Sequence, residues 1–288
     1  MSAPFWETNL ILRVVCGSQA YGLATAESDT DTRGVCVPPK RLLLGLERFE
    51  QHESAGCDHV TYGLAKFARL ALEGNPNIIE TLFTPPELMP VLSELGRRLV
   101  DARSKTLSRR VGERFMGYAQ DQRRRMERHR RWLASPPPAE PRPAAFGGAE
   151  EAGRVRWPSS QAEKAYKAGH KRWRQYHDWR ARRNPARAAL EERHGYDTKH
   201  AMHLCRLVTM GEEVLREGVV RVRRPDAEWL RGVRAGALAY DELLAWVDER
   251  VARLPGLVAA SPLPEAPDVA GFEAVVIEIH ERFHYGER

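Results

Sequence analysis

Short apolar runs separated by polar turns occupy the first part of the chain and predict strands. Leu10 to Val15 is apolar and β-branched and stops at Gly17, so it predicts a buried strand. Gly34 to Val37 forms a second apolar run, which Pro38-Pro39 ends. His59 to Tyr62 predicts a third, short strand that leads into a helix. This part of the chain is therefore expected to be an α/β unit.

Helical periodicity dominates the rest of the chain. The apolar positions Leu64, Phe67, Ala68 and Ala71 fall on one side of a helix. Further helical spans are predicted at residues 76–83, 88–133, 160–182, 198–217, 226–252 and 271–283. Residues 40–55 are expected to be a surface connection with a short helical piece, and the Pro- and Gly-rich residues 135–160 a flexible loop. We expect an α+β chain with a sheet-containing domain at 1–100 and a helical domain at 101–288.

The turn after the first strand carries the most informative chemistry. Gly17-Ser18 offers backbone N–H groups and a hydroxyl that can hold a phosphate. Asp29 and Asp31 follow in the segment that runs into the second strand, and side chains two apart on a strand share a face. Two carboxylates beside a phosphate-holding turn predict a Mg²⁺ site that binds a nucleoside triphosphate. The alternative is an ordinary Ser-Asp-Thr-Asp surface turn.

This arrangement resembles the DNA-polymerase-β-type nucleotidyltransferases, and within them the RNA-repair-associated predicted nucleotidyltransferase family of the RlaP or YcgL type. The stretches that carry the resemblance are residues 17–34, 58–66, 75–80 and 195–204. The resemblance implies a small mixed β-sheet nucleotidyltransferase fold in the first domain and a helical C-terminal part. One departure is Gln19, where many relatives have Arg.

The resemblance also implies roles for individual residues. Asp29, Asp31 and Asp58 would hold Mg²⁺ or Mn²⁺, with Asp58 as the third carboxylate that two-metal chemistry needs. Gly17, Ser18 and Ser28 would contact the nucleotide. Asp58 could instead be a cap or turn residue, and Glu53 is a weaker candidate because nothing around it predicts a strand.

Glu80 is unusual because it lies within an apolar helix. A carboxylate is rarely buried unpaired, so Glu80 is expected either to face the site or to pair with a cation such as Lys66. Pairing is the favoured interpretation.

The helix that begins at Thr198 has an apolar stripe and an opposite basic side. Lys199, His203 and Arg206 form that basic side, which could clamp a triphosphate or an RNA backbone. A solvated polar face is the alternative, and the resemblance favours nucleotide binding. His200 and His203 could both reach a metal, but the neighbouring sequence offers no further ligand, and the scattered Cys16, Cys36, Cys57 and Cys205 predict no zinc site.

Two basic helices are candidates for nucleic-acid binding. One presents Lys164, Lys167, Lys171 and Arg174 along one side, and the other carries an arginine cluster at residues 123–131. Solvated charged faces are the alternative. The formal net charge of +6 favours a polyanionic partner without identifying it.

Together these features predict an Mg²⁺-dependent enzyme that moves a nucleoside monophosphate from an NTP to an acceptor hydroxyl. The expected acceptor is an RNA end, in RNA repair or tRNA end processing. Two alternatives remain: transfer to a protein side chain, and an RNA-binding protein without catalysis. The sequence shows no long apolar run and no signal peptide, so a cytoplasmic protein without membrane contact is expected.

Overall fold

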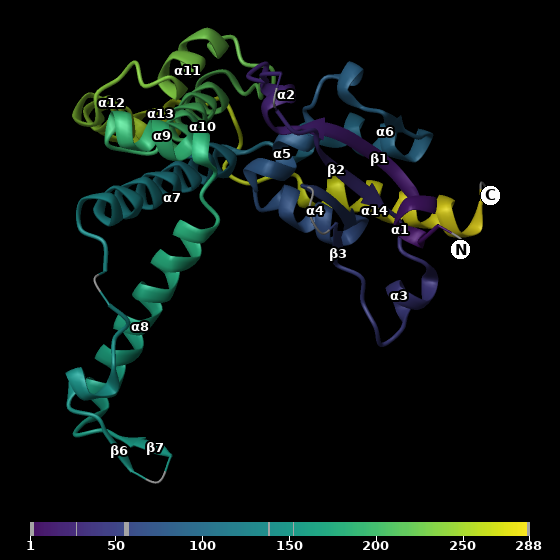
Figure 1. Ribbon diagram of the computed structural model, residues 1–288. Helices are drawn as coiled ribbons and strands as arrows, with labels where there is room; N and C mark the ends of the chain where they lie inside the picture. Colours follow the sequence, from purple (N-terminus) through teal and green to yellow (C-terminus); the bar gives the residue numbers. More distant parts are fainter. Residues whose placement is uncertain (1–2, 27, 55–57, 138, 152, 287–288) are drawn as a thin grey trace.

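The structure combines a sheet unit, a helical unit beside it and a long arm that projects from the helical unit (Figure 1). It is a computed structural model that describes residues 3–26, 28–54, 58–137, 139–151 and 153–286. Within these residues, no helix is both long and apolar enough to cross a membrane.

A mixed sheet carries the N-terminal part of the chain. The described strands in this sheet are β1 (Leu10–Cys16), β2 (Asp31–Cys36), β3 (Gln51–Glu53), β4 (His59–Gly63) and β5 (Val91–Leu92). They lie in the order β3-β4-β2-β1-β5, with β2 and β4 parallel and the other pairs antiparallel. The predicted α+β class and mixed sheet are confirmed. The strands missing from the prediction, β3 and β5, are short edge strands whose few residues produce no readable alternation.

Helices from both ends of the chain cover the sheet. The helices are α4 (Leu64–Leu72), α5 (Pro76–Leu82), α6 (Glu94–Asp101) and α14 (Val269–Tyr285). One apolar core joins Leu12 and Val35 of the strands to Phe67 of α4 and Phe272 of α14. The division expected at residue 100 stays a prediction, but the last helix contributes to the core of the sheet unit.

Two long helices, α7 (Arg109–Ala134) and α10 (Thr198–Glu217), form the centre of the helical unit. A Cβ atom on Gly112 would lie 2.3 Å from Cγ of Leu215, so the glycine allows α7 and α10 to approach closely. Smaller helices surround this pair: α9 (Pro185–His194), α11 (Ala227–Arg234), α12 (Tyr240–Ala252) and α13 (Leu254–Ala260). The span predicted at 226–252 is thus two helices, and Gly236 between them has a φ of +87°, which ends the first.

The remaining elements are short. They are α1 (Phe5–Thr8), α2 (Gly17–Tyr21), α3 (Lys40–Leu44), the 3₁₀ turns at Pro86–Leu88, Ala102–Thr106 and Pro143–Phe146, and the hairpin of β6 (Ala149–Glu151) and β7 (Arg154–Arg156). The span predicted as one helix at 88–133 is therefore interrupted by β5 and by the turn at Ala102–Thr106. Cys16, Cys36 and Cys205 are buried free thiols, and Cys57 lies outside the described residues.

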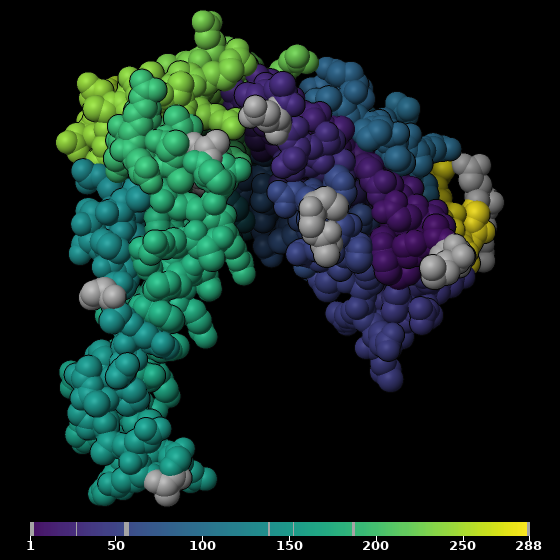
Figure 2. Space-filling model, viewed as in Figure 1, coloured from purple at the N-terminus to yellow at the C-terminus, as the bar shows by residue number. Residues whose placement is uncertain are grey.

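The arm consists of α8 (Ser160–Ala181) and the β6–β7 hairpin at its far end (Figure 1). The segment predicted as a loop at 135–160 thus contains a 3₁₀ turn and a hairpin. In the space-filling view the arm stands away from the sheet unit and leaves an open hollow between them (Figure 2).

A buried ion pair joins the two units. The guanidinium of Arg206 on α10 donates to the carboxylate of Glu80 on α5, and the Tyr21 hydroxyl at the end of α2 donates to the other oxygen of that carboxylate. Arg206 is 5% exposed and Glu80 2%. Pairing of Glu80 with a cation is confirmed, but the cation is Arg206. The ammonium of Lys66 instead lies 3.9 Å from Glu50.

We expect Arg206→Met to lower the free energy of unfolding by about 3–5 kcal/mol, because it leaves the Glu80 carboxylate buried without its counter-charge. Arg216→Met is the matched control: Arg216 is exposed on the same helix, and its loss should change stability by less than about 0.5 kcal/mol. Urea unfolding followed by circular dichroism measures both. Equal effects from the two substitutions would contradict a stabilising ion pair.

Candidate active site

The Gly-Ser turn and the second aspartate of the motif meet at one end of the sheet. Cys16 pairs with Asp31 in the antiparallel register of β1 and β2, so Gly17 begins α2 directly beside Asp31. Gly17 has a φ of +67°, and a Cβ atom there would lie 2.2 Å from Oδ2 of Asp31. Glycine is required for both reasons. Its missing side chain lets the Asp31 carboxylate lie against the backbone at the start of α2.

The parallel pairing of β2 and β4 brings Asp58 to the same place. Thr32 is in register with His59, and the Thr32 N–H donates to the carbonyl oxygen of Asp58 at 3.1 Å. Asp58 is exposed, directly precedes β4 and lies close enough to Asp31 for its charge to act there. The structure thus brings Asp58 to Asp31 from a distant part of the sequence.

Asp29 reaches the cluster from a loop. The expectation that Asp29 and Asp31 alternate on one strand is wrong, because β2 begins at Asp31. The charge of Asp29 nevertheless acts on Asp31. The Gln19 side chain donates to the hydroxyl of Thr30 at 2.8 Å and so ties this loop to α2. Gln19 therefore has a structural contact at the position where the related family often has Arg.

Burial raises the pKa of the Asp31 carboxyl above its usual value, and the negative charge of Asp58 raises it further. The cations Arg33 and Lys199 act in the opposite direction, and Asp29 adds a smaller upward contribution. The crowding of three carboxylates is what a divalent cation relieves. Carboxylate oxygens are hard ligands, so this donor set fits Mg²⁺ or Mn²⁺.

Lys199 connects the helical unit to this cluster. It is exposed in the first turn of α10, and its charge acts on Asp31 although 168 positions separate the two residues. His203 lies one turn further along and is half-buried. The predicted basic side of three residues is wrong for Arg206. Its guanidinium is buried against Glu80 of α5 and the Tyr21 ring of α2, so it does not join Lys199 at the carboxylates. Lys199 is thus the cation that α10 presents to the carboxylates.

Arg33 is a site residue that the sequence analysis missed. It lies two positions after Asp31 on β2, so the two side chains share a face. Its Nη2 donates to Asn77 at 3.1 Å, while its Nη1 is buried and has no hydrogen-bond partner among the described residues. The sequence signal for Arg33 was its spacing: it lies two positions after Asp31 in the segment that leads into an apolar strand, which places both charges on one face.

Two other candidates have local contacts. The Ser28 hydroxyl accepts a hydrogen bond from the Thr25 N–H at 2.9 Å and closes a turn, so nucleotide contact by Ser28 stays a prediction. Glu53 ends β3, an edge strand that the sequence did not reveal, and its carboxylate accepts a hydrogen bond from the Gln51 side chain.

The cationic side chains predicted to bind nucleic acid differ in their surroundings. Those on α8 are exposed along the projecting arm: Lys164, Lys167, Lys171 and Arg174. Lys167 pairs with Glu163 at 2.6 Å. The arginine cluster on α7 is partly neutralised, since Arg123 bonds both Glu127 and Asp248. The arm therefore offers the more available positive charge.

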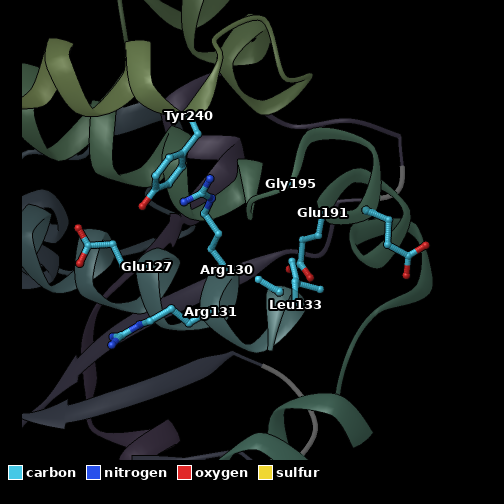
Figure 3. A pocket seen from close by; sticks show the side chains of 9 residues that line it. Glu127, Arg130, Arg131, Leu133, Glu191, Gly195 and Tyr240 are labelled. Atoms are coloured by element: carbon cyan, nitrogen blue, oxygen red, sulfur yellow. The ribbon is translucent and has the colours of Figure 1, made fainter. Parts of the chain in front are cut away.

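A pocket of about 740 Å³ lies elsewhere, among α7, the α9–α10 turn and the start of α12 (Figure 3). Arg130 and Arg131 of α7 line it together with Glu191 and Tyr240, and the Arg130 guanidinium stacks 4.1 Å from the centre of the Tyr240 ring. None of the residues of the carboxylate cluster lines this pocket.

Comparison with known proteins gives two matches. A family described as RlaP, RNA repair pathway DNA polymerase beta family, matches residues 5–245. The chain is also similar to an uncharacterized 38.9 kDa protein in the nrdC-mobD intergenic region of Enterobacteria phage T4, with 30% identity over 126 residues. That match covers 39% of this chain and only 37% of the phage protein. No solved structure matches the chain.

Gly17→Ala should weaken Mn²⁺ binding by about tenfold or more, because the added Cβ displaces the Asp31 carboxylate. Gly22→Ala is the matched control, since Gly22 also has a positive φ, +72°, but a Cβ there meets nothing within 4 Å. The control shares the backbone strain without the contact with Asp31. Electron paramagnetic resonance of added Mn²⁺ measures binding. If both variants bind Mn²⁺ equally, the close approach of Gly17 and Asp31 has no role.

Proposed function

The chain belongs to the RlaP family, the RNA repair pathway DNA polymerase beta family, and on this premise we propose that it transfers a nucleoside monophosphate from an NTP to an acceptor hydroxyl. The family supports a nucleotidyltransferase in general. The observation that carries the specific proposal is the Asp31 carboxylate against the backbone of Gly17, with Asp29, Asp58 and Lys199 close enough to act on its charge.

Three carboxylates are proposed to hold the divalent cations: Asp29, Asp31 and Asp58. When bound, Mg²⁺ or Mn²⁺ at such a site neutralises phosphate charge and favours the ionised acceptor hydroxyl. Asp58 is exposed beside Asp31 and would assist deprotonation of that hydroxyl. The hydroxyl oxygen forms a bond to the α-phosphorus, the α–β anhydride bond breaks, and pyrophosphate leaves.

The rest of the site would bind and neutralise the triphosphate. Gly17 and Ser18 offer the N–H groups and hydroxyl at the start of α2, with Ser28 from the following turn. Lys199 would neutralise charge that develops on the leaving pyrophosphate, assisted by His203. Arg206 takes a supporting role here, because its ion pair with Glu80 fixes the helix that carries Lys199.

The proposed acceptor is an RNA end, from a broken RNA or a tRNA. The exposed cations of α8 and the open hollow between the arm and the sheet unit support a polyanionic acceptor (Figure 2). Transfer to a protein side chain would leave the basic arm without a role. A non-catalytic RNA-binding protein would leave the carboxylate cluster without one. We further propose that the protein acts in the cytoplasm.

Asp31→Asn should lower nucleotide transfer by roughly 100-fold or more while the fold is retained, because a neutral amide replaces a charged ligand of equal size. Asp101→Asn removes an exposed carboxylate on α6 and serves as the control. The assay incubates protein with each labelled NTP, Mg²⁺ and total RNA, and then separates RNA from protein. Label on protein alone would favour the alternative acceptor. Unchanged transfer by Asp31→Asn would refute the proposed site.

Reversal of charge at Lys167 and Lys171 should weaken RNA binding and reduce its salt dependence, by a slope of about 0.7–0.9 for each lost phosphate contact. NTP binding should be unaffected. The double variant Arg97→Glu/Arg110→Glu alters the net charge equally at exposed positions of α6 and α7 and is the matched control. Filter binding across a series of salt concentrations measures both. An RNA affinity that responds equally to both double variants would exclude a specific role for the arm.

A further inference from the structure

A second cluster of metal-ligating side chains lies where α7 meets the beginning of α10. Asp197 precedes α10, His200 lies in its first turn, and His129 comes from α7. One ligand atom from each residue lies within 4.8 Å of those from the other two. The Asp197 side chain is fully buried, and the side chains of His129 and His200 are only 12% and 15% exposed.

The two distances from the histidines to Asp197 are close to those between ligands around one ion. Nδ1 of His129 and Nε2 of His200 each lie 3.6 Å from the same oxygen of Asp197. A contact of 3.6 Å is too long for a hydrogen bond. Bonds of about 2.0–2.1 Å to a tetrahedral zinc ion hold neighbouring ligand atoms about 3.3–3.4 Å apart. Small adjustments would therefore bring all three atoms onto one ion.

The surroundings support the same interpretation. Nδ1 of His129 is buried and has no hydrogen-bond partner among the described residues, which is costly unless something binds it. The His129 ring packs against both Trp132 and Trp179, with ring centres 5.4 and 5.2 Å away, and this packing restricts its orientation. Beside Asp197 is the buried Glu191, whose carboxylate is 2.6 Å from Arg183. Glu191 and Asp197 share a side-chain hydrogen bond, and carboxylates that ligate metals are commonly hydrogen-bonded by a neighbouring group.

We propose that His129, Asp197 and His200 bind a divalent transition metal ion of the zinc type, at a site separate from the carboxylates around Asp31. Two imidazoles and one carboxylate suit Zn²⁺ and leave a fourth position for water or another ligand. Mg²⁺ is disfavoured because it takes oxygen ligands.

The ion would fasten α7 to the start of α10. The backbone N–H of His200 donates to Asp197 at 3.0 Å, so Asp197 also caps the helix. Lys199 lies between the two α10 ligands in sequence, and its side chain acts on Asp31. The second ion would therefore fix the helix turn that presents Lys199, without contact with the nucleotide.

The test is a Co²⁺ titration of the untagged, chelator-treated full-length protein that carries Asp31→Asn, so that the carboxylate cluster does not contribute. Visible absorption of tetrahedral Co²⁺ should saturate at one ion per chain, and excess Zn²⁺ should abolish it. His129→Phe and His200→Asn should each weaken Co²⁺ binding by at least about 100-fold. His177→Asn, a half-buried histidine of the arm, should leave binding unchanged.

Circular dichroism of the metal-free variants verifies that they fold. If His200→Asn does not fold, His129→Phe still tests the site, because its ring can keep the contacts with Trp132 and Trp179. Absence of saturable Co²⁺ absorption in the parent protein would overturn the proposal, as would a folded His129→Phe variant that binds Co²⁺ like the parent. Neither outcome affects the proposed transfer chemistry, which is measured with Asp31 intact. Loss of transfer in Asp31→Asn likewise leaves this site untouched.

Discussion

The buried ion pair of Arg206 and Glu80 determines how the two units of this protein meet. Both charges are removed from water, which is costly, and their mutual attraction and the hydrogen bonds to the carboxylate offset that cost. The Tyr21 hydroxyl completes the carboxylate's bonding, and the Arg206 guanidinium lies 3.9 Å from the centre of the Tyr21 ring. Three elements that are far apart in sequence, α2, α5 and α10, are thereby held in one arrangement.

This arrangement has a direct consequence for the site. Tyr21 is the last residue of α2, and Gly17 is its first, so the ion pair and the Gly-Ser turn occupy opposite ends of the same short helix. Lys199 lies about two helical turns from Arg206 on α10. Further hydrogen bonds from the helical unit hold the end of α2: the Arg224 N–H donates to Tyr21 O at 3.1 Å, and the Arg231 guanidinium donates to Gly22 O at 2.7 Å. The position of Lys199 relative to Gly17 is thus set by the ion pair and these hydrogen bonds.

The start of α10 serves two charge clusters. Lys199 acts on the carboxylates around Asp31, whereas Asp197 and His200 belong to the cluster with His129. These clusters differ in chemistry, since the first consists of carboxylates that suit Mg²⁺ and the second is rich in imidazole nitrogen. The start of α10 therefore connects the proposed nucleotide site to the contact between α7 and α10.

The sequence by itself determined the features that depend on neighbouring residues. An apolar, β-branched run and glycine chemistry were sufficient for β1, for the turn at Gly17 and for the aspartates that follow, and local helical pattern was sufficient for α5 and α10. Only the tertiary structure decided which distant groups meet. The β2–β4 register brings Asp58 to Asp31, and the packing of α10 buries Arg206 while it leaves Lys199 exposed. His129 joins Asp197 and His200 because α7 and α10 pack together. Local pattern records the conformation of a segment, but burial and charge pairing depend on the elements that pack against it, which no local pattern contains.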